Sequence, residues 1–567
     1  MVRSSKISAQ LCIDALSSYN INDVVISPGS RCAPLVIELT KNTDFNLYSI
    51  IDERSAGFVA LGIAQSKNEP VALVCTSGSA LLNYAPALAE AFYSKVPLIV
   101  ISADRPEYLI TQGDGQTIKQ PGSLNSIVKH FINIPDIFDA NSPLLNHANR
   151  ILNESLSCSL ENPRQPVHIN MSFDEPLYDT ISESLSNFRK IDINIPNQTI
   201  LNQEKLIEFQ NIVKGSKKTL IIVGALPINK SLNIFLEKLN QLNQVYTIIE
   251  TTSNLTGDIG YCGIDKFMTS VEGHNSNRFN PDVVLTFGNN IISKKIKTWL
   301  RLNQQLIHVH FGIENNVLDS FFSISKQFET NDFQQFLELN YNDNSDSTFK
   351  LDSDELVREI KFRQFEFEKN IEFSDFLVYK LLSEYIPKKS IVHFGNSSAI
   401  RYSQLFEKFG QMKISSNRGT SGIEGSLSTS VGIAYSNPSV SVWCILGDLS
   451  FFYDSNAFLN SKLPANLKVV VVNNNGGGIF RIIDGPKTVN KFEEFIETEH
   501  YFTSKHICKT FNVHYTSVVD VAKLKVALNN TINSPKINLL EIFTPKQLND
   551  KVLKSFFNSL KTNHEQT

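Results

Sequence analysis

The sequence has no closely paired cysteines, no long apolar run and almost no excess of one charge. Its seven cysteines are scattered over 567 residues and never form a C-x-x-C pair, so neither a zinc site nor a disulfide framework is indicated. Free thiols are typical of a reducing compartment, and we expect a cytoplasmic protein. With 53 basic and 57 acidic residues the net charge is −4, which predicts no nucleic-acid partner. No apolar run could span a membrane, so membrane insertion is not expected.

Apolar and β-branched residues are plentiful, and their pattern indicates the fold class. Hydrophobic residues make up 42% of the chain and charged residues 19%, proportions typical of a packed globular protein too long for one core. Short β-type runs alternate with helical patterns, which predicts α/β domains with parallel sheets. Polar connections near 174–198 and 341–347 divide the chain into three predicted α/β domains, at 1–180, 181–345 and 346–567.

Polar segments follow the predicted strands of the first domain. The strands are expected at 24–26, 47–51, 71–75, 97–102 and 167–171. The segments after the first four are Ser27–Arg31, Asp52–Arg54, Thr76–Ser79 and Ala103–Pro106. Open α/β sheets bind ligands at the carboxyl ends of their strands, so we expect these segments to be functional.

The third domain carries two polar motifs, each behind an apolar β-branched run. Asp448 follows the run 440–446, and Asn474 follows the run 467–472, 26 residues after Asp448. Two parallel strands with a helix between them would place these side chains next to each other. A carboxylate, an amide oxygen and a carbonyl of the glycine turn at Gly476 are ligands that suit Mg²⁺, which often takes its other ligands from phosphates. We therefore expect a diphosphate cofactor.

Either motif alone would indicate only a surface turn, because Gly-Asp and Asn-Gly are common turn dipeptides. Together they resemble the diphosphate-binding signature of thiamine-diphosphate enzymes. The resemblance implies the thiamine-diphosphate-binding fold, with pyrimidine, central and diphosphate domains. It also implies that thiamine diphosphate and Mg²⁺ (or Mn²⁺) bind, with the metal on Asp448, Asn474 and Gly476. Further cofactor contacts are implied for Ser397, Ile423, Gly447, Leu449, Ser450, Gly477, Ile479 and Phe480.

Glu53 lies between a predicted strand and the helical pattern 55–65. A carboxylate at this point could simply cap the helix. The resemblance implies instead that Glu53 hydrogen-bonds the pyrimidine ring of the cofactor and activates it. Ile423 matches the apolar residue that keeps the cofactor bent, although core packing would also explain an isoleucine there.

Six segments narrow the resemblance to one branch, the 2-succinyl-5-enolpyruvyl-6-hydroxy-3-cyclohexene-1-carboxylate (SEPHCHC) synthases of menaquinone biosynthesis. The segments are Ile26–Arg31, Asp52–Ala56, Thr76–Ala80, Ser102–Pro106, Ser416–Gly419 and Asn473–Phe480. The resemblance implies an enzyme that decarboxylates 2-oxoglutarate and adds the succinyl group to isochorismate. It also implies a homodimer or homotetramer, with the cofactor between the first domain of one subunit and the third of another.

Both implied substrates are dicarboxylates, so their site needs several cations, and arginine suits paired contacts with carboxylates. The resemblance implies that Ser397, Arg401 and Arg418 hold the succinyl end. Arg31, Arg105, Gln116 and Lys294 are implied either to face isochorismate or to position the reaction intermediate, with Ser30, Phe480 and Ile483 also in the substrate site. The implied catalytic residues are Glu53, Arg31, Gln116 and Arg401. Any one of these arginines could alternatively form an ordinary surface ion pair.

Two other functions stay open at this stage. One is another 2-oxo-acid carboligase or decarboxylase, such as an acetolactate-synthase-like enzyme, and the other is a cofactor-binding subunit without activity. The chain has no His-His pair, and Gln116 follows Gly115 where pyruvate-decarboxylase-type enzymes carry such a pair. Gly115 and Lys295 both depart from the branch, which usually carries Asn and Arg at these positions.

Overall fold

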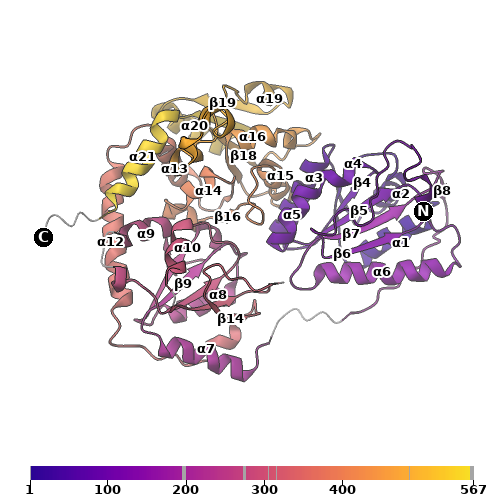
Figure 1. The fold of residues 1–567 in the computed structure, drawn as a ribbon. Helices are drawn as coiled ribbons and strands as arrows, with labels where there is room; N and C mark the ends of the chain where they lie inside the picture. The colour runs from indigo at the N-terminus through magenta and orange to yellow at the C-terminus, as the bar shows by residue number, and fades with distance from the viewer. Residues whose placement is uncertain are drawn as a thin grey trace.

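The computed structural model describes residues 2–193, 200–272, 276–303, 305–314, 316–483 and 485–561. Three six-stranded sheets, each with all its neighbours parallel, form the framework, and helices cover their faces (Figure 1). The predicted α/β fold with three parallel sheets is therefore confirmed. Residues 194–198 of the predicted first connection lie outside the described residues. Among the described helices, none is both long and apolar enough to cross a membrane.

The first sheet has the strand order β3-β2-β4-β5-β7-β6. Its strands are β2 (Asp23–Ile26), β3 (Asn46–Ser49), β4 (Val71–Cys75), β5 (Leu98–Asp104), β6 (His130–Ile134) and β7 (Val167–Ser172). Helices α1 (Ile7–Ser18), α2 (Ala33–Lys41) and α6 (Pro143–Leu160) cover one face, and α3 (Glu53–Lys67), α4 (Ser79–Asn83) and α5 (Ala85–Ser94) cover the other. A short antiparallel pair, β1 (Arg3–Ser4) and β8 (Thr180–Ile181), joins the two ends of this region.

The second sheet has the order β11-β10-β9-β12-β13-β14. Its strands are β9 (Thr219–Val223), β10 (Val245–Ile249), β11 (Tyr261–Cys262), β12 (Val283–Phe287), β13 (Ile307–Phe311) and β14 (Ile324–Phe328). The helices around it are α7 (Gln203–Gly215), α8 (Lys230–Leu239), α9 (Ile264–Val271), α10 (Lys294–Arg301) and α11 (Gln334–Leu337).

The third sheet has the order β16-β15-β17-β18-β20-β19. Its strands are β15 (Ile391–Phe394), β16 (Lys413–Ser415), β17 (Val442–Gly447), β18 (Leu467–Asn473), β19 (His514–Val518) and β20 (Asn538–Phe543). Its longer helices are α12 (Phe349–Glu368), α13 (Asp375–Tyr385), α15 (Ser426–Ser436), α20 (Val521–Asn533) and α21 (Lys546–Ser559). The shorter ones are α14 (Ser398–Ser403), α16 (Asp448–Tyr453), α17 (Ile479–Ile482), α18 (Phe492–Phe495) and α19 (Lys505–Thr510).

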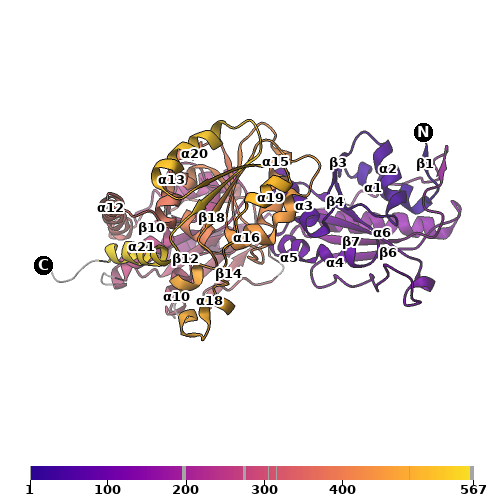
Figure 2. The same ribbon diagram turned by 90° about the horizontal axis from the view of Figure 1, so that it is seen from above.

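The third sheet shares an apolar core with each of the other two regions. Val469 and Val471 of β18 belong to the core that includes α3 and α5, whereas Val470 and Val472 belong to the core that extends into the central region. This alternation explains the unbroken apolar run of β18, because both faces of the strand are buried. Helices α3 and α15 lie side by side in both views (Figures 1 and 2).

Candidate active site

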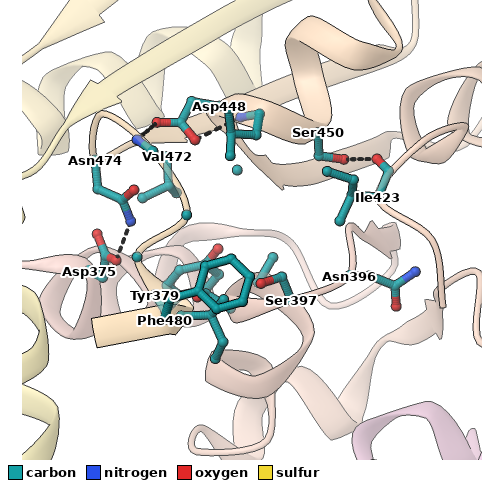
Figure 3. Close-up of a pocket in the computed structure, with 18 residues that line it drawn as sticks. Asp375, Tyr379, Asn396, Ser397, Ile423, Asp448, Ser450, Val472, Asn474 and Phe480 are labelled. Carbon is teal, nitrogen blue, oxygen red and sulfur yellow. Dashed lines mark hydrogen bonds between the residues drawn. The ribbon is translucent and has the colours of Figure 1, made fainter. Parts of the chain in front are cut away.

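A pocket opens at the carboxyl ends of β15, β17 and β18, where it is lined by Gly447 at the end of β17 and by Asn396 and Asn474 just beyond the ends of β15 and β18 (Figure 3). It brings together every predicted cofactor residue except Glu53. The lining residues are Asp375, Tyr379, Asn396–Ala399, Ile423, Gly447–Ser450, Val472, Asn474 and Gly476–Phe480. The pairing of β17 with β18 accounts for this arrangement, because parallel strands end at the same edge of the sheet.

The three predicted metal ligands lie within this pocket. Asp448 is the first residue of α16, and its Oδ1 accepts a hydrogen bond from the backbone of Leu449 at 2.7 Å. Its Oδ2 accepts one from the backbone N–H of Gly476 at 3.0 Å, which ties the two polar loops together. The Gly476 carbonyl accepts from Gly478 N–H at 2.9 Å and has a second lone pair available.

The side-chain amide of Asn474 is fixed through its nitrogen, and its oxygen has no hydrogen-bond partner among the described residues. Its Nδ2 donates to Asp375 Oδ2 at 3.0 Å, and its buried Oδ1 has no hydrogen-bond partner among the described residues. Burial raises the pKa of Asp375 to about 6, although hydrogen bonds from Thr544 and Asn474 oppose this shift. An unpartnered buried oxygen is costly, and it fits a bound cation.

The charge of the pocket also fits a metal. Its described lining residues include the carboxylates of Asp375 and Asp448 but no lysine or arginine. Two carboxylates would repel a diphosphate, whereas a divalent cation between them would attract it. The oxygen ligand set therefore suits Mg²⁺ or a similar hard cation.

Glycines 476–478 allow the chain to turn closely around the pocket. Gly476 has a φ of 141°, which is strained for residues with a side chain. A Cβ at Gly477 would lie 2.9 Å from the Phe480 ring, and one at Gly478 would lie 2.8 Å from Asn474 Nδ2. Across the pocket, Ser450 Oγ donates to the Ile423 carbonyl at 2.5 Å and fixes the backbone of Ile423 at the pocket wall.

His500 is a neighbour of Asp448 that sequence reasoning missed. Its Nε2 lies 3.3 Å from Asp448 Oδ2, while its Nδ1 accepts a hydrogen bond from the backbone of Phe502 at 3.1 Å. The imidazole also stacks on the Phe502 ring and meets the Phe452 ring edge-on. Because His500 follows no predicted strand or motif, only the folded chain reveals the contact.

Glu53 is the first residue of α3 and is half-buried. The helix is capped by Asp52, whose side chain accepts from Ser55 N–H at 3.2 Å, so capping does not account for Glu53. Asn83 Nδ2 donates to Glu53 Oε2 at 3.3 Å, while Oε1 has no hydrogen bond with the described residues. Glu53 does not line the pocket of its own chain.

The predicted substrate residues of the first domain form a separate group at the edge of its sheet. Arg31 is buried, donates to the Phe173 carbonyl at 2.9 Å and pairs with Glu175 at 3.1 Å. Arg105 Nε donates to the Gly115 carbonyl at 3.0 Å, beside the exposed Gln116. Ser30 is likewise exposed there. The structure does not bring this group into the pocket of the same chain.

Arg401 and Arg418 lie beside the pocket, next to the central domain. Arg418 Nη1 donates to Oδ1 of the pocket residue Asn396 at 2.9 Å. Burial lowers the pKa of Arg418, an effect that Glu250 opposes and Arg401 adds to. Burial also raises the pKa of Glu250 to about 7, although the amides of Ile292 and Ser293 oppose it. The Arg401 guanidinium has no hydrogen bond or ion pair with the described residues, so its positive charge is left for a ligand.

The lysines of α10 are arranged differently from one another. Lys294 is exposed. Lys295 points to another side of the helix, where it donates to Thr269 Oγ1 at 2.6 Å and its Nζ lies 5.0 Å from the Phe557 ring centroid. Lys297, which the sequence did not single out, interacts electrostatically with Arg401 and with Glu250. Ile483 is partly exposed and is not among the pocket-lining residues.

Comparison with known proteins agrees with this geometry. Two family models match the chain, described as the N-terminal and C-terminal TPP binding domains of thiamine pyrophosphate enzymes, over residues 8–123 and 395–542. A 2-succinyl-5-enolpyruvyl-6-hydroxy-3-cyclohexene-1-carboxylate synthase of Flavobacterium johnsoniae is 40% identical over 97% of this chain and 98% of its own length. Proteins of the same name from Christiangramia forsetii and Flavobacterium psychrophilum are 40% and 39% identical, over 99% and 97% of this chain and 100% and 98% of their own lengths. The chain therefore belongs to the SEPHCHC synthase family of thiamine pyrophosphate enzymes.

Proposed function

We propose that this chain is a thiamine-diphosphate-dependent transferase that decarboxylates 2-oxoglutarate and joins the succinyl group to isochorismate. The products are SEPHCHC and carbon dioxide, in menaquinone biosynthesis. The observation that carries this proposal is the similarity, over nearly the whole chain, to synthases of that name. The pocket supports this proposal, because its oxygen ligand set and glycine loop lie next to two arginines, Arg401 and Arg418, whose positive charges are not neutralised by an ion pair with the described residues.

In this proposal Asp448, Asn474 and the Gly476 carbonyl hold Mg²⁺ or Mn²⁺, and the metal takes further oxygen ligands from the diphosphate. When bound, thiamine diphosphate supplies the carbanion-stabilising chemistry that the side chains lack. Gly447, Leu449, Ser450 and Gly477 shape the diphosphate end of the pocket. Ser397, Ile423, Ile479 and Phe480 orient the reacting end and keep water from it.

Glu53 is proposed to exchange a proton through Oε1 with the pyrimidine ring. Arg401 and Arg418, with Ser397, bind the distal carboxylate of 2-oxoglutarate, because guanidinium groups make paired contacts with carboxylates. We propose that the isochorismate site is formed by Ser30, Arg31, Arg105, Gln116, Lys294, Phe480 and Ile483. Arg31, Gln116 and Arg401 are the proposed catalytic residues besides Glu53.

We also propose a homodimer or homotetramer in which a second copy completes each site. Among the described residues, the pocket is lined only by residues 375–480, while Glu53 and Arg31 lie outside it. The three-domain division at 180 and 345 remains a proposal, supported by three six-stranded sheets that each fall within one range. The free thiols and the biosynthetic role support a cytoplasmic location.

The direct test is to incubate the protein with 2-oxoglutarate and isochorismate, with and without thiamine diphosphate and Mg²⁺, and to identify the product by mass. We expect SEPHCHC only when both additions are present. Carbon dioxide release from pyruvate, with none from 2-oxoglutarate, would favour an acetolactate-synthase-like enzyme instead.

Substitution Glu53→Gln distinguishes an enzyme from an inactive binding subunit. We expect turnover to fall roughly 10²- to 10⁴-fold, since proton transfer typically contributes that much. Thiamine diphosphate affinity, measured by calorimetry, should change little. Glu69→Gln alters an exposed carboxylate just beyond the other end of α3 and should leave turnover unchanged. Undiminished turnover in Glu53→Gln would contradict the proposed role.

A further inference from the structure

The loop 416–425 carries two of the proposed site residues but has no regular secondary structure. It connects β16 to α15 and contains Arg418 and Ile423. No strand or helix hydrogen bonds fix its path, so side chains from elsewhere must hold it.

The carboxylate of Glu90, a residue of α5 in the first domain, accepts hydrogen bonds from this loop across the domain boundary. Its side chain is only 1% exposed. Oε1 accepts from the backbone N–H of Gly419 at 2.7 Å, and Oε2 accepts from the N–H of Thr420 at 2.7 Å and its Oγ1 at 3.0 Å. Ser94 Oγ donates a fourth bond, to Oε1 at 2.6 Å. The buried carboxylate is thus satisfied by four donors, three of them from a loop more than 300 residues away in sequence.

The loop carbonyls are held by different residues. Asn396 Nδ2 donates to the carbonyls of Asn417 and Gly422 at 2.7 and 2.6 Å, and Asn290 of the central domain donates to that of Arg418 at 2.7 Å. Glu90 instead binds the two amides that immediately follow Arg418. Three domains therefore meet at Arg418, and Glu90 is the contribution of the first.

The contact leaves little room for movement. A Cβ at Gly419 would lie 2.5 Å from the Glu90 carbonyl and 2.6 Å from Ser94 Oγ. The loop backbone therefore lies directly on α5, and a shift of either changes where the Arg418 guanidinium reaches Asn396.

We propose that Glu90 is a positioning residue that sets the selectivity for dicarboxylate 2-oxo acids by fixing Arg418 across the domain boundary. The proposal rests on the proposed function, in which Arg418 binds the distal carboxylate of 2-oxoglutarate. A glutamine at position 90 could accept through one oxygen only, and its NH₂ would face amide and hydroxyl donors.

The test compares 2-oxoglutarate with 2-oxopentanoate, which has the same chain length but no second carboxylate. For each, kcat/KM is measured with isochorismate in the unsubstituted protein and in Glu90→Gln. The selectivity ratio is kcat/KM for 2-oxoglutarate divided by kcat/KM for 2-oxopentanoate. We expect this ratio to be roughly 10- to 100-fold lower in Glu90→Gln than in the unsubstituted protein, the scale of loss that follows a small displacement of a binding group. A merely structural role would lower both values equally and would overturn the proposal.

Two further variants sharpen the comparison. Gly419→Ala pushes the loop from α5 while leaving the Glu90 side chain intact, and it should lower the ratio in the same way. Glu38→Gln is the matched control, because Glu38 is 3% exposed and accepts from the Ser4 backbone within the first domain, away from the loop. It should leave the ratio unchanged.

Hydrogen exchange separates this proposal from the proposed function. Peptides covering 416–425 should exchange faster in Glu90→Gln than in Glu38→Gln, whether or not 2-oxoglutarate is a substrate. If the unsubstituted protein does not use 2-oxoglutarate, the proposed function fails. Unchanged exchange in Glu90→Gln, or an unchanged ratio in an active enzyme, overturns the positioning role.

Discussion

At the scale of single residues, the proposed metal site depends on the orientation of one amide. Asn474 presents Oδ1 to the pocket because Asp375 takes the hydrogen bond from Nδ2. Residues that orient metal ligands in this way contribute strongly to metal affinity. Asp375 is therefore as much a part of the proposed metal site as the three ligands.

The variant Asp375→Ala removes the acceptor and lets the Asn474 amide rotate. We expect the affinity for Mg²⁺ to fall by roughly 10- to 100-fold, measured by calorimetric titration of Mg²⁺ in the presence of thiamine diphosphate. Thr544→Val serves as the control, since it removes the other side-chain bond of Asp375 and leaves Asn474 in place. Equal Mg²⁺ affinities in Asp375→Ala and the unsubstituted protein would refute this role.

Sequence reasoning named the pocket residues that belong to local motifs and missed residues whose contacts with them arise only on folding. Asp448 and Asn474 were predictable because each follows an apolar run, and both runs and the spacing between them lie in one continuous stretch of sequence. Glu90 and Glu250 were not, since an isolated glutamate in a helical or strand pattern gives no sign of its distant partner. The same limit explains why Lys297 was missed while its neighbour Lys294 was named.

At the scale of elements, the crossing of α3 and α15 joins the regions of the first and third sheets. The two backbones touch at glycines: a Cβ at Gly62 would lie 2.1 Å from the Thr429 carbonyl oxygen, and one at Gly432 would lie 2.0 Å from that of Val59. Such approaches exclude any side chain. Because Glu53 begins α3, this crossing also sets where Glu53 lies.

The variant Gly62→Ala should force the helices apart. We expect the free energy of unfolding in urea to fall by about 1–3 kcal/mol, as for other overpacked cores. Gly215→Ala is the matched control at the end of α7, where a Cβ would meet nothing within 4 Å. Its stability should stay the same or rise slightly, because alanine favours helices. A destabilisation of the same size in both variants would contradict the packing explanation.

Asp454, which binds the first turn of α15, should make the stability of the protein depend on pH. It is fully buried, accepts from Ser428 N–H at 2.7 Å and Ser428 Oγ at 2.8 Å, and burial raises its pKa to about 7. The pKa of Asp454 in the folded state lies above its unfolded value of about 4, so folding favours the protonated carboxyl. The contribution of this carboxyl to folding stability is therefore fully present below pH 4 and is lost as the pH rises through 7.

We therefore expect stability to fall relative to Asp454→Asn as the pH rises from 4 to 7, by up to roughly 1 kcal/mol for each pH unit. Urea unfolding of both proteins at several pH values measures this difference. Asp520 is a partly exposed helix cap whose pKa is lowered by the Lys523 amide, so stability relative to Asp520→Asn should fall as the pH decreases below about 4, which is the opposite sign. A pH-independent difference for Asp454→Asn would show that the buried carboxyl does not titrate in this range.

At the scale of the whole molecule, the three parallel sheets were predictable and the way they pack was not. The alternation of β-branched runs and helical patterns is local, so it revealed the fold class and five of the six strands of the first sheet. The edge strand β6 was missed because His130 and Asn133 interrupt its apolar pattern. The cores that β18 shares with both neighbouring regions depend on contacts between distant segments, which periodicity does not encode.

Exposed aromatic residues beside the pocket indicate where a second copy would bind. Tyr501 and Phe502 are 84% and 64% exposed, and the Phe502 ring packs on Phe452 of α16, next to the half-exposed Tyr453. Apolar side chains grouped in this way on a surface mark protein interfaces. The proposed dimer would bury them and would bring the first domain of the partner over the pocket.

The double variant Tyr501→Ser/Phe502→Ser should therefore weaken the assembly. We expect sedimentation to give at least a dimer for the unsubstituted protein and a larger monomer fraction for the variant at equal concentration. Activity should fall in parallel on dilution, because each pocket lacks Glu53 from its own chain. Leu302→Ser, which alters an equally exposed residue of the central domain, should leave the assembly unchanged. A fully active monomer would contradict the shared site, since Glu53 would then have to reach the pocket within one chain.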